Sequence, residues 1–186
     1  MNAFSIAAGL ALVASPFAAL HAASLSSDKR FTNACYESAE MGRHDGGAIM
    51  QCDFALRQEM LTSEQRAATL VNRGILHILA GNLARAKGDF EAALMIDPMQ
   101  AEAWLGKGIV EWRAGNNQAV FQPLERAIQL RPRRPAVAYY IRGLANEVQG
   151  NLKAAYSDLT TARQLDPKWA EPAMQLRRYR VVRRRA

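Results

Sequence analysis

The sequence predicts an all-α solenoid, in which antiparallel helix hairpins stack one on the next. The first observation is a period of 34 or 35 residues, at which the same small, apolar and proline positions recur. The second is a Gly-Asn pair that keeps step with this period and would end the first helix of each hairpin. The third is the helical spacing of apolar residues on both sides of that pair. The recurring residues are Gly74, Gly108 and Gly143, then Ala86, Val120 and Ala155, then Phe90, Leu124 and Leu159, and finally Pro98, Pro132 and Pro167.

The first clear repeat shows how the sequence specifies each element. Apolar residues from Leu70 to Ile78 follow helical spacing. Gly81 is expected to end the helix, because glycine adopts the left-handed backbone conformation at a helix end with the least strain. Phe90 belongs to the buried stripe of the second helix. Asp97-Pro98 ends that helix, because the residue before a proline avoids the helical region. The same order of elements is predicted for the two repeats that follow.

The second repeat departs from this pattern at Pro123, which falls inside its predicted second helix. A proline there costs about 3 kcal/mol if the helix is continuous. We therefore expect this helix to start late or to bend, leaving Phe121 in an irregular turn. Either a degenerate repeat or a functional hinge would account for the substitution.

The pattern resembles the tetratricopeptide-repeat (TPR) family, whose signature combines a small residue at position 8, Gly near 15, Ala at 20, a large apolar residue at 24, Ala at 27 and Pro at 32. The resemblance implies about three and a half stacked hairpins and a protein-interaction scaffold of the exported bacterial type, without catalytic activity. At position 8, the small residue would let the two helices of a hairpin approach closely. The implied repeats are residues 67–100, 101–134 and 136–169, which lie within a repeat region at 63–169.

Residues 24–62 resemble a degenerate copy of the same hairpin. In the family's register, Cys35 and Cys52 fall on facing helices, which in an exported chain implies a disulfide. Closing that loop would be worth about 3 kcal/mol. A pair of buried reduced thiols is the alternative. The segment His44–Gly47 would be a loose connector, and residues 170–186 would supply a capping helix over 170–182 and a basic tail.

Residues 1–23 are predicted to be a secretory signal peptide. The stretch Ala3–Leu20 contains no charged side chain, and we expect cleavage after Ala22 or Ala23. A retained membrane anchor is the alternative, although about 18 alanine-rich residues interrupted by Pro16 make a poor spanning helix. Together with the family resemblance, the short signal predicts a periplasmic or secreted protein of a bacterium.

The net charge of +7 is concentrated at the C-terminus, where six arginines occur among the last ten residues. The rest of the chain is nearly neutral, which argues against nucleic-acid binding, because that needs a basic stripe across the fold. The tail would suit an anionic membrane or lipopolysaccharide surface, and a solvated tail that aids solubility is the alternative. These arginines are Arg177, Arg178, Arg180, Arg183, Arg184 and Arg185.

No constellation of catalytic or metal-binding residues is evident in the sequence. His21, His44 and His77 are far apart, and two cysteines are too few for a structural zinc site. Gly46-Gly47 follows no predicted strand, so it is not expected to cradle a phosphate. We predict no enzyme activity, no cofactor and no metal.

Position 7 of each repeat carries a cation: Arg73, Lys107 and Arg142. Arg73 precedes Asp89 by 16 residues, and Arg142 precedes Asp158 by the same interval, which predicts one ion pair inside each of these hairpins. Lys107 lacks such a partner, because a proline holds the matching position. The favoured interpretation is a structural pair within the repeat, and a ladder of cations that reads a ligand is the alternative.

In the TPR family the first helices of the hairpins line a concave face that receives a peptide or a helix of a partner. Here that lining is mostly apolar, with one Trp and one Tyr of the kind that dominates binding hot spots. The Lys and Asn clamp by which some relatives grip a terminal carboxylate is missing. The alternative is that the chain's own N-terminal hairpin or C-terminal helix fills the groove. The predicted groove residues are Ile75, Ile78, Leu105, Ile109, Trp112, Tyr140, Leu144 and Glu147.

Overall fold

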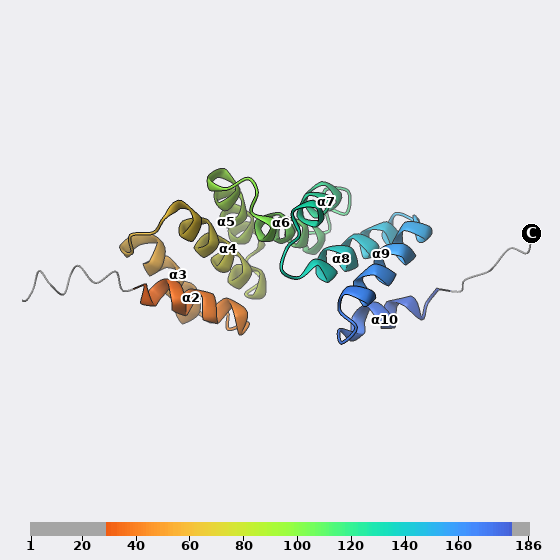
Figure 1. The fold of residues 1–186 in the computed structure, drawn as a ribbon, viewed down its shortest axis with the longest axis horizontal. Helices are drawn as coiled ribbons and strands as arrows, with labels where there is room; N and C mark the ends of the chain where they lie inside the picture. Colours follow the sequence, from red (N-terminus) through yellow and green to blue (C-terminus); the bar gives the residue numbers. More distant parts are fainter. Residues whose placement is uncertain (1–28, 180–186) are drawn as a thin grey trace, which may run out of the picture.

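The computed structural model describes residues 29–179, and this part of the chain forms nine α-helices and no strand. Successive helices pair as antiparallel hairpins along an arch, with α4, α6 and α8 on its inner side and α5 and α7 on its outer side (Figure 1). The helices are α2 (Arg30–Glu40), α3 (Gly46–Gln58), α4 (Ser63–Leu79), α5 (Leu83–Ile96), α6 (Ala101–Arg113), α7 (Phe121–Leu130), α8 (Pro135–Val148), α9 (Leu152–Leu165) and α10 (Ala170–Leu176).

The predicted all-α solenoid is confirmed. Each helix contacts the next along the chain, and the first helices of neighbouring hairpins also contact one another, α2 with α4, α4 with α6 and α6 with α8. Within residues 29–179, no helix combines the length and the apolar character that a membrane crossing needs. The predicted signal peptide at 1–23 and the last seven residues lie outside the described part of the chain.

The hairpins turn at glycines in the left-handed conformation, as the repeat pattern predicts. Gly81, Gly115 and Gly150 have φ angles of 78°, 77° and 78°, which side chains larger than hydrogen rarely adopt. Gly42 has a φ of 67° and ends α2 in the same way. The degenerate first hairpin therefore also turns at a glycine, which the repeat pattern did not predict.

The connector of the first hairpin differs from the sequence prediction. Gly46 and Gly47 open α3, so they are helical residues and not a loose linker. Asp45 caps this helix, because its side chain accepts a hydrogen bond of 2.9 Å from the backbone N–H of Ala48. The connector is thus shorter and more ordered than predicted.

The small residues at position 8 allow the paired helices to approach closely. A Cβ atom on Gly74 would lie 2.8 Å from the ring of Phe90, and one on Gly108 would lie 2.2 Å from Leu124. Gly106 meets the same Phe90 ring from the next hairpin, where a Cβ atom would lie 2.3 Å away. Phe90 is therefore held between two hairpins by two glycines, of which the repeat pattern identified only Gly74.

Helix α7 starts late, as Pro123 predicts, and spans 10 residues where α5 and α9 each span 14. It begins at Phe121, so the prediction that Phe121 lies in an irregular turn is wrong. Pro123 is the third residue of the helix. The first N–H groups of a helix have no intrahelical acceptor, so the proline there removes no hydrogen bond.

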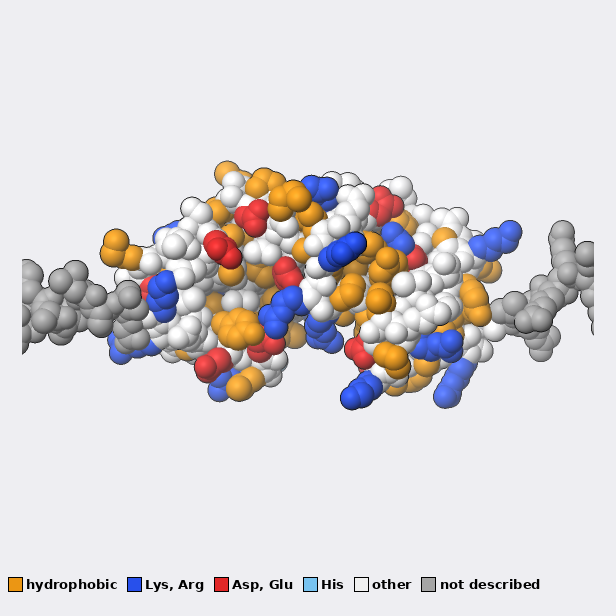
Figure 2. All heavy atoms as spheres, in the orientation of Figure 1, with side chains coloured by type: hydrophobic (Ala, Val, Ile, Leu, Met, Phe, Trp, Pro, Cys, Tyr) orange, Lys and Arg blue, Asp and Glu red, His pale blue; other side chains and the backbone are white. Residues whose placement is uncertain are grey.

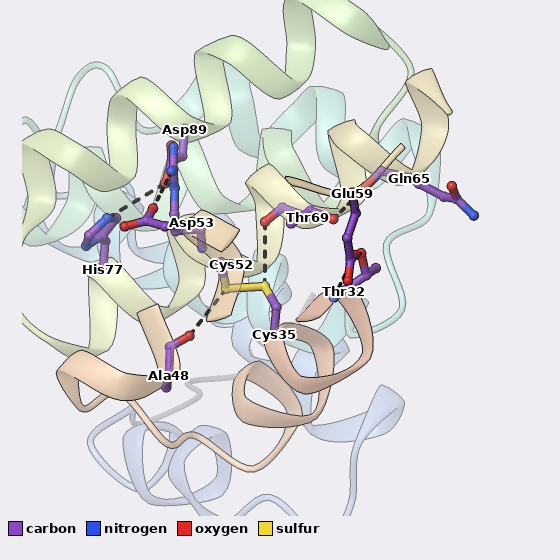
Figure 3. The surroundings of a disulfide bond; sticks show 11 residues. Thr32, Cys35, Ala48, Cys52, Asp53, Glu59, Gln65, Thr69, His77 and Asp89 are labelled. Carbon is purple, nitrogen blue, oxygen red and sulfur yellow. Dashed lines mark hydrogen bonds and ion pairs between the residues drawn. A yellow bond between two sulfur atoms is a disulfide. The ribbon is translucent and has the colours of Figure 1, made fainter. Parts of the chain in front are cut away.

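The first hairpin is fastened by the predicted disulfide between Cys35 and Cys52, whose Cα atoms lie 4.8 Å apart (Figure 3). Both cysteines are fully buried, and Leu76 of α4 packs in the same apolar cluster. The carboxylate of Glu59 accepts a hydrogen bond of 3.1 Å from the backbone N–H of Thr32, which ties the start of α2 to the end of α3. The hairpin is thus fixed at both ends and docked on the first clear repeat.

Helix α10 is shorter than predicted, since it ends at Leu176 where the sequence suggested a helix to residue 182. Pro172 lies in its first turn, as expected, and is buried. The helix contacts α9. It therefore covers the last hairpin as a short helix of 7 residues and not as a long cap.

Candidate functional site

Apolar and aromatic side chains of α4, α6 and α8 gather on the inner side of the arch. Of the eight predicted groove residues, six are partly exposed. Five of these are apolar or aromatic, namely Ile75, Ile109, Trp112, Tyr140 and Leu144, and the sixth is Glu147. Figure 2 shows hydrophobic side chains on both flanks of the hollow in this face. These helices therefore present an accessible apolar lining with two aromatic anchors.

Two of the predicted groove residues belong mainly to the core. Ile78 is 6% exposed and packs in the cluster around Phe90, and Leu105 is 8% exposed and packs in the next cluster along the solenoid. Both hold neighbouring hairpins together and offer little surface to a partner. Sequence register alone does not separate such residues from their exposed neighbours, because both lie on the same helix face.

The C-terminal segment covers the α8 end of the inner face. Trp169 packs against Tyr140 with 4.7 Å between ring centroids. Arg178 pairs with Glu147 at 2.9 Å, so this predicted groove carboxylate is already engaged. Burial, and next the Glu147 carboxylate, raise the pKa of Tyr179. Residues 169–179 thus occupy one end of the face while the centre stays accessible.

The predicted ion pairs inside the first and third repeats are confirmed. The guanidinium of Arg73 donates to both oxygens of Asp89, at 2.6 and 3.0 Å, and that of Arg142 donates to Asp158 at 2.7 and 2.9 Å. These hydrogen bonds raise the pKa of both arginines. Arg73 also donates to Asp53 of α3 at 2.7 Å, which fastens the first hairpin to the second.

The middle repeat uses the same positions differently, because Pro123 replaces the aspartate. Lys107 lies 3.8 Å from Glu91 of the preceding hairpin. Glu111 accepts a hydrogen bond of 2.9 Å from Lys87, also of the preceding hairpin, and this bond lowers the pKa of Glu111. In the first and third repeats, the charged residues at these positions join the two helices of one hairpin. In the middle repeat they join one hairpin to the preceding one.

Two polar cavities lie at equivalent places in the first and third repeats. The first has a volume of about 290 Å³ and the second about 330 Å³. Each is built around the Arg-Asp pair of its hairpin and a polar residue at position 11. The first is lined by Ile49, Asp53, Arg73, His77, Arg85, Gly88 and Asp89. The second is lined by Phe121, Glu125, Arg142, Asn146, Ala154, Ser157 and Asp158.

His77 is the buried titratable group of the first cavity, and it lies beside the Arg73–Asp89 pair (Figure 3). Its Nε2 atom lies 3.9 Å from Asp89, its Nδ1 atom has no hydrogen-bond partner, and the residue is 5% exposed. Burial lowers the pKa of His77 from its usual value of 6.5, and the Asp89 carboxylate only partly offsets this. The imidazole is therefore neutral in the folded protein at pH 7.

This buried histidine predicts a loss of stability on acidification. Because the pKa of His77 is lower in the folded than in the unfolded chain, the unfolded chain binds more protons as the pH falls below about 6.5. The free energy of unfolding should therefore decrease between pH 7 and pH 5. The His77→Asn variant should show a flatter profile in urea titrations, since Asn146 fills the same position in the third repeat and bonds Asp158.

The matched control is His44→Asn, because His44 is exposed. Its profile should follow that of the wild type. Parallel pH profiles for the wild type and His77→Asn would contradict the assignment.

No group of three or more His, Cys, Asp or Glu side chains within residues 29–179 is arranged to hold a metal ion. His77 and His44 lie on different hairpins, and Cys52 is engaged in the disulfide. The described part of the chain brings together apolar surface on the inner helices and ion pairs within and between the hairpins.

No known protein-family model matches the sequence. Among solved structures, the chain is similar to MamA of Desulfovibrio magneticus RS-1, with 24% identity, a TM-score of 0.64 and coverage of 81% of this chain and 82% of that one. It is also similar to the first TPR domain of human RPAP3, with 21% identity, a TM-score of 0.57 and coverage of 62% and 90%. The first TPR of Spaghetti (RPAP3), solved with an HSP90 peptide, gives 21% identity, a TM-score of 0.58 and coverage of 63% and 94%.

These similarities agree with the repeat pattern, the left-handed turn glycines and the stacked hairpins. The chain has the tetratricopeptide-repeat fold. Sequence identities of 21–24% support a common fold, and they do not identify a binding partner for this chain.

Proposed function

We propose that this protein is a non-enzymatic interaction scaffold that binds a peptide or a helix of a partner protein on its concave face. The observation that carries the proposal is the row of partly exposed apolar side chains that α4, α6 and α8 contribute to one continuous inner surface. Contiguous apolar surface with aromatic anchors marks protein-interaction sites. The RPAP3 domain, which shares the fold, was solved with a bound HSP90 peptide.

The rigid stacking of the hairpins supports this role. Phe90 and Leu124 are fully buried against glycines of α4 and α6, so the inner helices are held close to their partners on the outer side. A surface held in this way is preorganised, which reduces the entropy lost when a partner binds. The absence of a Lys and Asn clamp favours recognition through apolar side chains over capture of a terminal carboxylate.

We place the protein in the bacterial envelope or outside the cell. The Cys35–Cys52 disulfide supports an oxidising compartment, because such bonds are rare in the cytosol. The predicted signal peptide, with cleavage after Ala22 or Ala23, points the same way. It falls outside the described residues and stays a prediction from the sequence.

The second candidate, a tether to an anionic membrane or lipopolysaccharide surface through the C-terminal arginines, also stays a prediction from the sequence. One of the six arginines has a role inside the fold, since Arg178 pairs with Glu147. Arg177 is exposed and remains accessible to an anionic surface. The others, Arg180, Arg183, Arg184 and Arg185, lie outside the described residues.

Trp112→Ala is expected to weaken partner binding about 30-fold, because a central aromatic anchor typically contributes about 2 kcal/mol. The partner is first captured in intact cells by a photo-crosslinking amino acid at Leu144 and identified by mass spectrometry. Calorimetric titration with a synthetic peptide of the crosslinked segment then compares the wild type with Trp112→Ala.

The matched control is Met95→Ala, because Met95 is 86% exposed on α5 of the outer side. This variant should bind like the wild type. Equal affinity of the wild type and Trp112→Ala, with both proteins folded, would contradict the proposed role of the concave face.

A further inference from the structure

The last hairpin, made of α8 and α9, carries exposed apolar side chains at its turn. On α9, Leu152 is 56% exposed and Tyr156 is 39% exposed, and Val148 at the end of α8 is 60% exposed. Leu152 and Tyr156 are four residues apart, so they share one face of the helix. We call these three residues the end patch, because the turn between α8 and α9 lies at the far end of the arch (Figure 1).

The same positions of the earlier repeats are covered by the following hairpin. Leu83 corresponds to Leu152, and it is partly buried against the apolar cluster that α5 shares with α6. Phe121 corresponds to Tyr156, and it packs in the cluster that α7 shares with α8. At this position the first repeat has Lys87, which donates to a carboxylate of α6 at 2.9 Å. The end patch therefore lies on the face that receives the next first helix of the solenoid.

Helix α10 takes the place of that next helix and is too short to cover α9. It has 7 residues, whereas α6 has 13 and α8 has 14. At 1.5 Å per residue, α10 is about 10 Å long and α9 about 21 Å. The chain after α10 brings the ring of Tyr179 within 5.7 Å of the ring of Tyr156, between centroids, and Tyr156 still remains accessible. The stacking face of α9 is thus only partly covered by the described residues.

The surroundings of the end patch are basic. Lys153 and Arg177 are exposed, and neither forms an ion pair among residues 29–179. The neighbouring carboxylate, Glu147, is already paired with Arg178 at 2.9 Å. A second copy of this chain would bring the same cations to the contact, and residues 180–186 carry four further arginines. Charge complementarity therefore favours an acidic occupant that comes from another protein.

We propose that the end patch is a second docking site, which takes an acidic amphipathic helix of a partner protein. This helix stacks on α9 as α6 stacks on α5, with its apolar side chains on Leu152 and Tyr156 and its carboxylates toward Lys153 and Arg177. The site uses α9, whereas the concave face is lined by α4, α6 and α8. One scaffold can therefore hold two partners at the same time.

Two synthetic peptides with blocked ends serve as probes. Both start from the sequence of α6, because α6 covers the equivalent face of α5. The acidic peptide carries Lys107→Glu and Arg113→Glu, and the basic peptide carries Glu102→Lys and Glu111→Lys. In NMR titrations of the ¹⁵N-labelled full chain, the acidic peptide should bind, and the basic peptide should bind about tenfold more weakly because its charges face cations.

Variants of the full chain locate the binding. The acidic peptide should shift the amide signals around Leu152 and Tyr156, and the double variant Leu152→Ala with Tyr156→Ala should weaken its binding about tenfold. The matched control is Leu165→Ala, because Leu165 is 49% exposed at the other end of α9. This control should bind like the wild type. All of these proteins should keep the wild-type circular dichroism spectrum.

The proposal would be overturned by equal binding of the two peptides, by unchanged binding to the double variant, or by no binding at all. Signal shifts centred on Trp112 and Leu144 in place of α9 would also overturn it. If the acidic peptide binds only after removal of residues 180–186, that segment is the occupant. A dimer that Leu152→Ala dissociates would identify a second copy, and either finding would refute an external helix. None of these results bears on the concave face, which Trp112→Ala tests separately.

Discussion

Replacing Phe90 by alanine is expected to lower the free energy of unfolding by about 3–5 kcal/mol. The ring is fully buried and lies between Gly74 of its own hairpin and Gly106 of the next, both within contact distance. Neither glycine has a side chain that could move into the space, so truncation leaves a cavity at the junction of two hairpins. Urea denaturation followed by far-UV circular dichroism measures the loss.

Met95→Ala provides the comparison on the same helix, because its side chain is 86% exposed. It should change the free energy of unfolding by less than about 0.5 kcal/mol. A Phe90→Ala variant as stable as Met95→Ala would mean that the two hairpins do not pack in the register described, and the solenoid would have to be reconsidered.

Loss of the disulfide is the second large effect. The free energy of unfolding of the double variant Cys35→Ala with Cys52→Ala should be about 3 kcal/mol lower. The disulfide joins residues 17 positions apart, and without this cross-link the unfolded chain gains conformational entropy. In a solenoid each repeat contacts only its neighbours, so the first hairpin should open before the three clear repeats unfold. Native-state hydrogen exchange should show fast exchange in α2 and α3 and near-normal protection in α8 and α9.

The double variant avoids free thiols, and the reduced wild type should behave in the same way. Two results would contradict this account of the first hairpin. One is a variant that keeps wild-type stability, and the other is a loss of protection spread evenly over all the hairpins.

Local sequence signals predicted most of the fold. Turn glycines such as Gly81 could be predicted because they recur at a fixed period. The ion pair between Arg73 and Asp89 could be predicted because its two residues lie close together in the chain, at a spacing that recurs in the third repeat. The disulfide followed from the family's register. Gly42 was missed because the first hairpin lacks the glycine of position 8, and because Gly42 is followed by Arg43 and not by the asparagine of the other turns. Gly106 was missed because it serves the packing between repeats and recurs in no other hairpin.

The candidate site was only partly predictable. The resemblance to the TPR family implied which helix face points inward, and it placed Trp112 and Tyr140 there. The sequence could not show that Ile78 is buried in the core, that Arg178 forms an ion pair with Glu147, or that Arg133 forms one with Glu40. These outcomes depend on the curvature of the whole solenoid, which is the sum of small rotations between hairpins and has no signature at any one position.

The central claim is that the inner helices hold the partner, and hydrogen–deuterium exchange with and without the captured peptide tests it most directly. The account predicts slower exchange in α4, α6 and α8 on binding, with little change in α5, α7 and α9 beyond the general stabilisation that any ligand confers. Protection confined to the outer helices, or to the segment after α10, would contradict it.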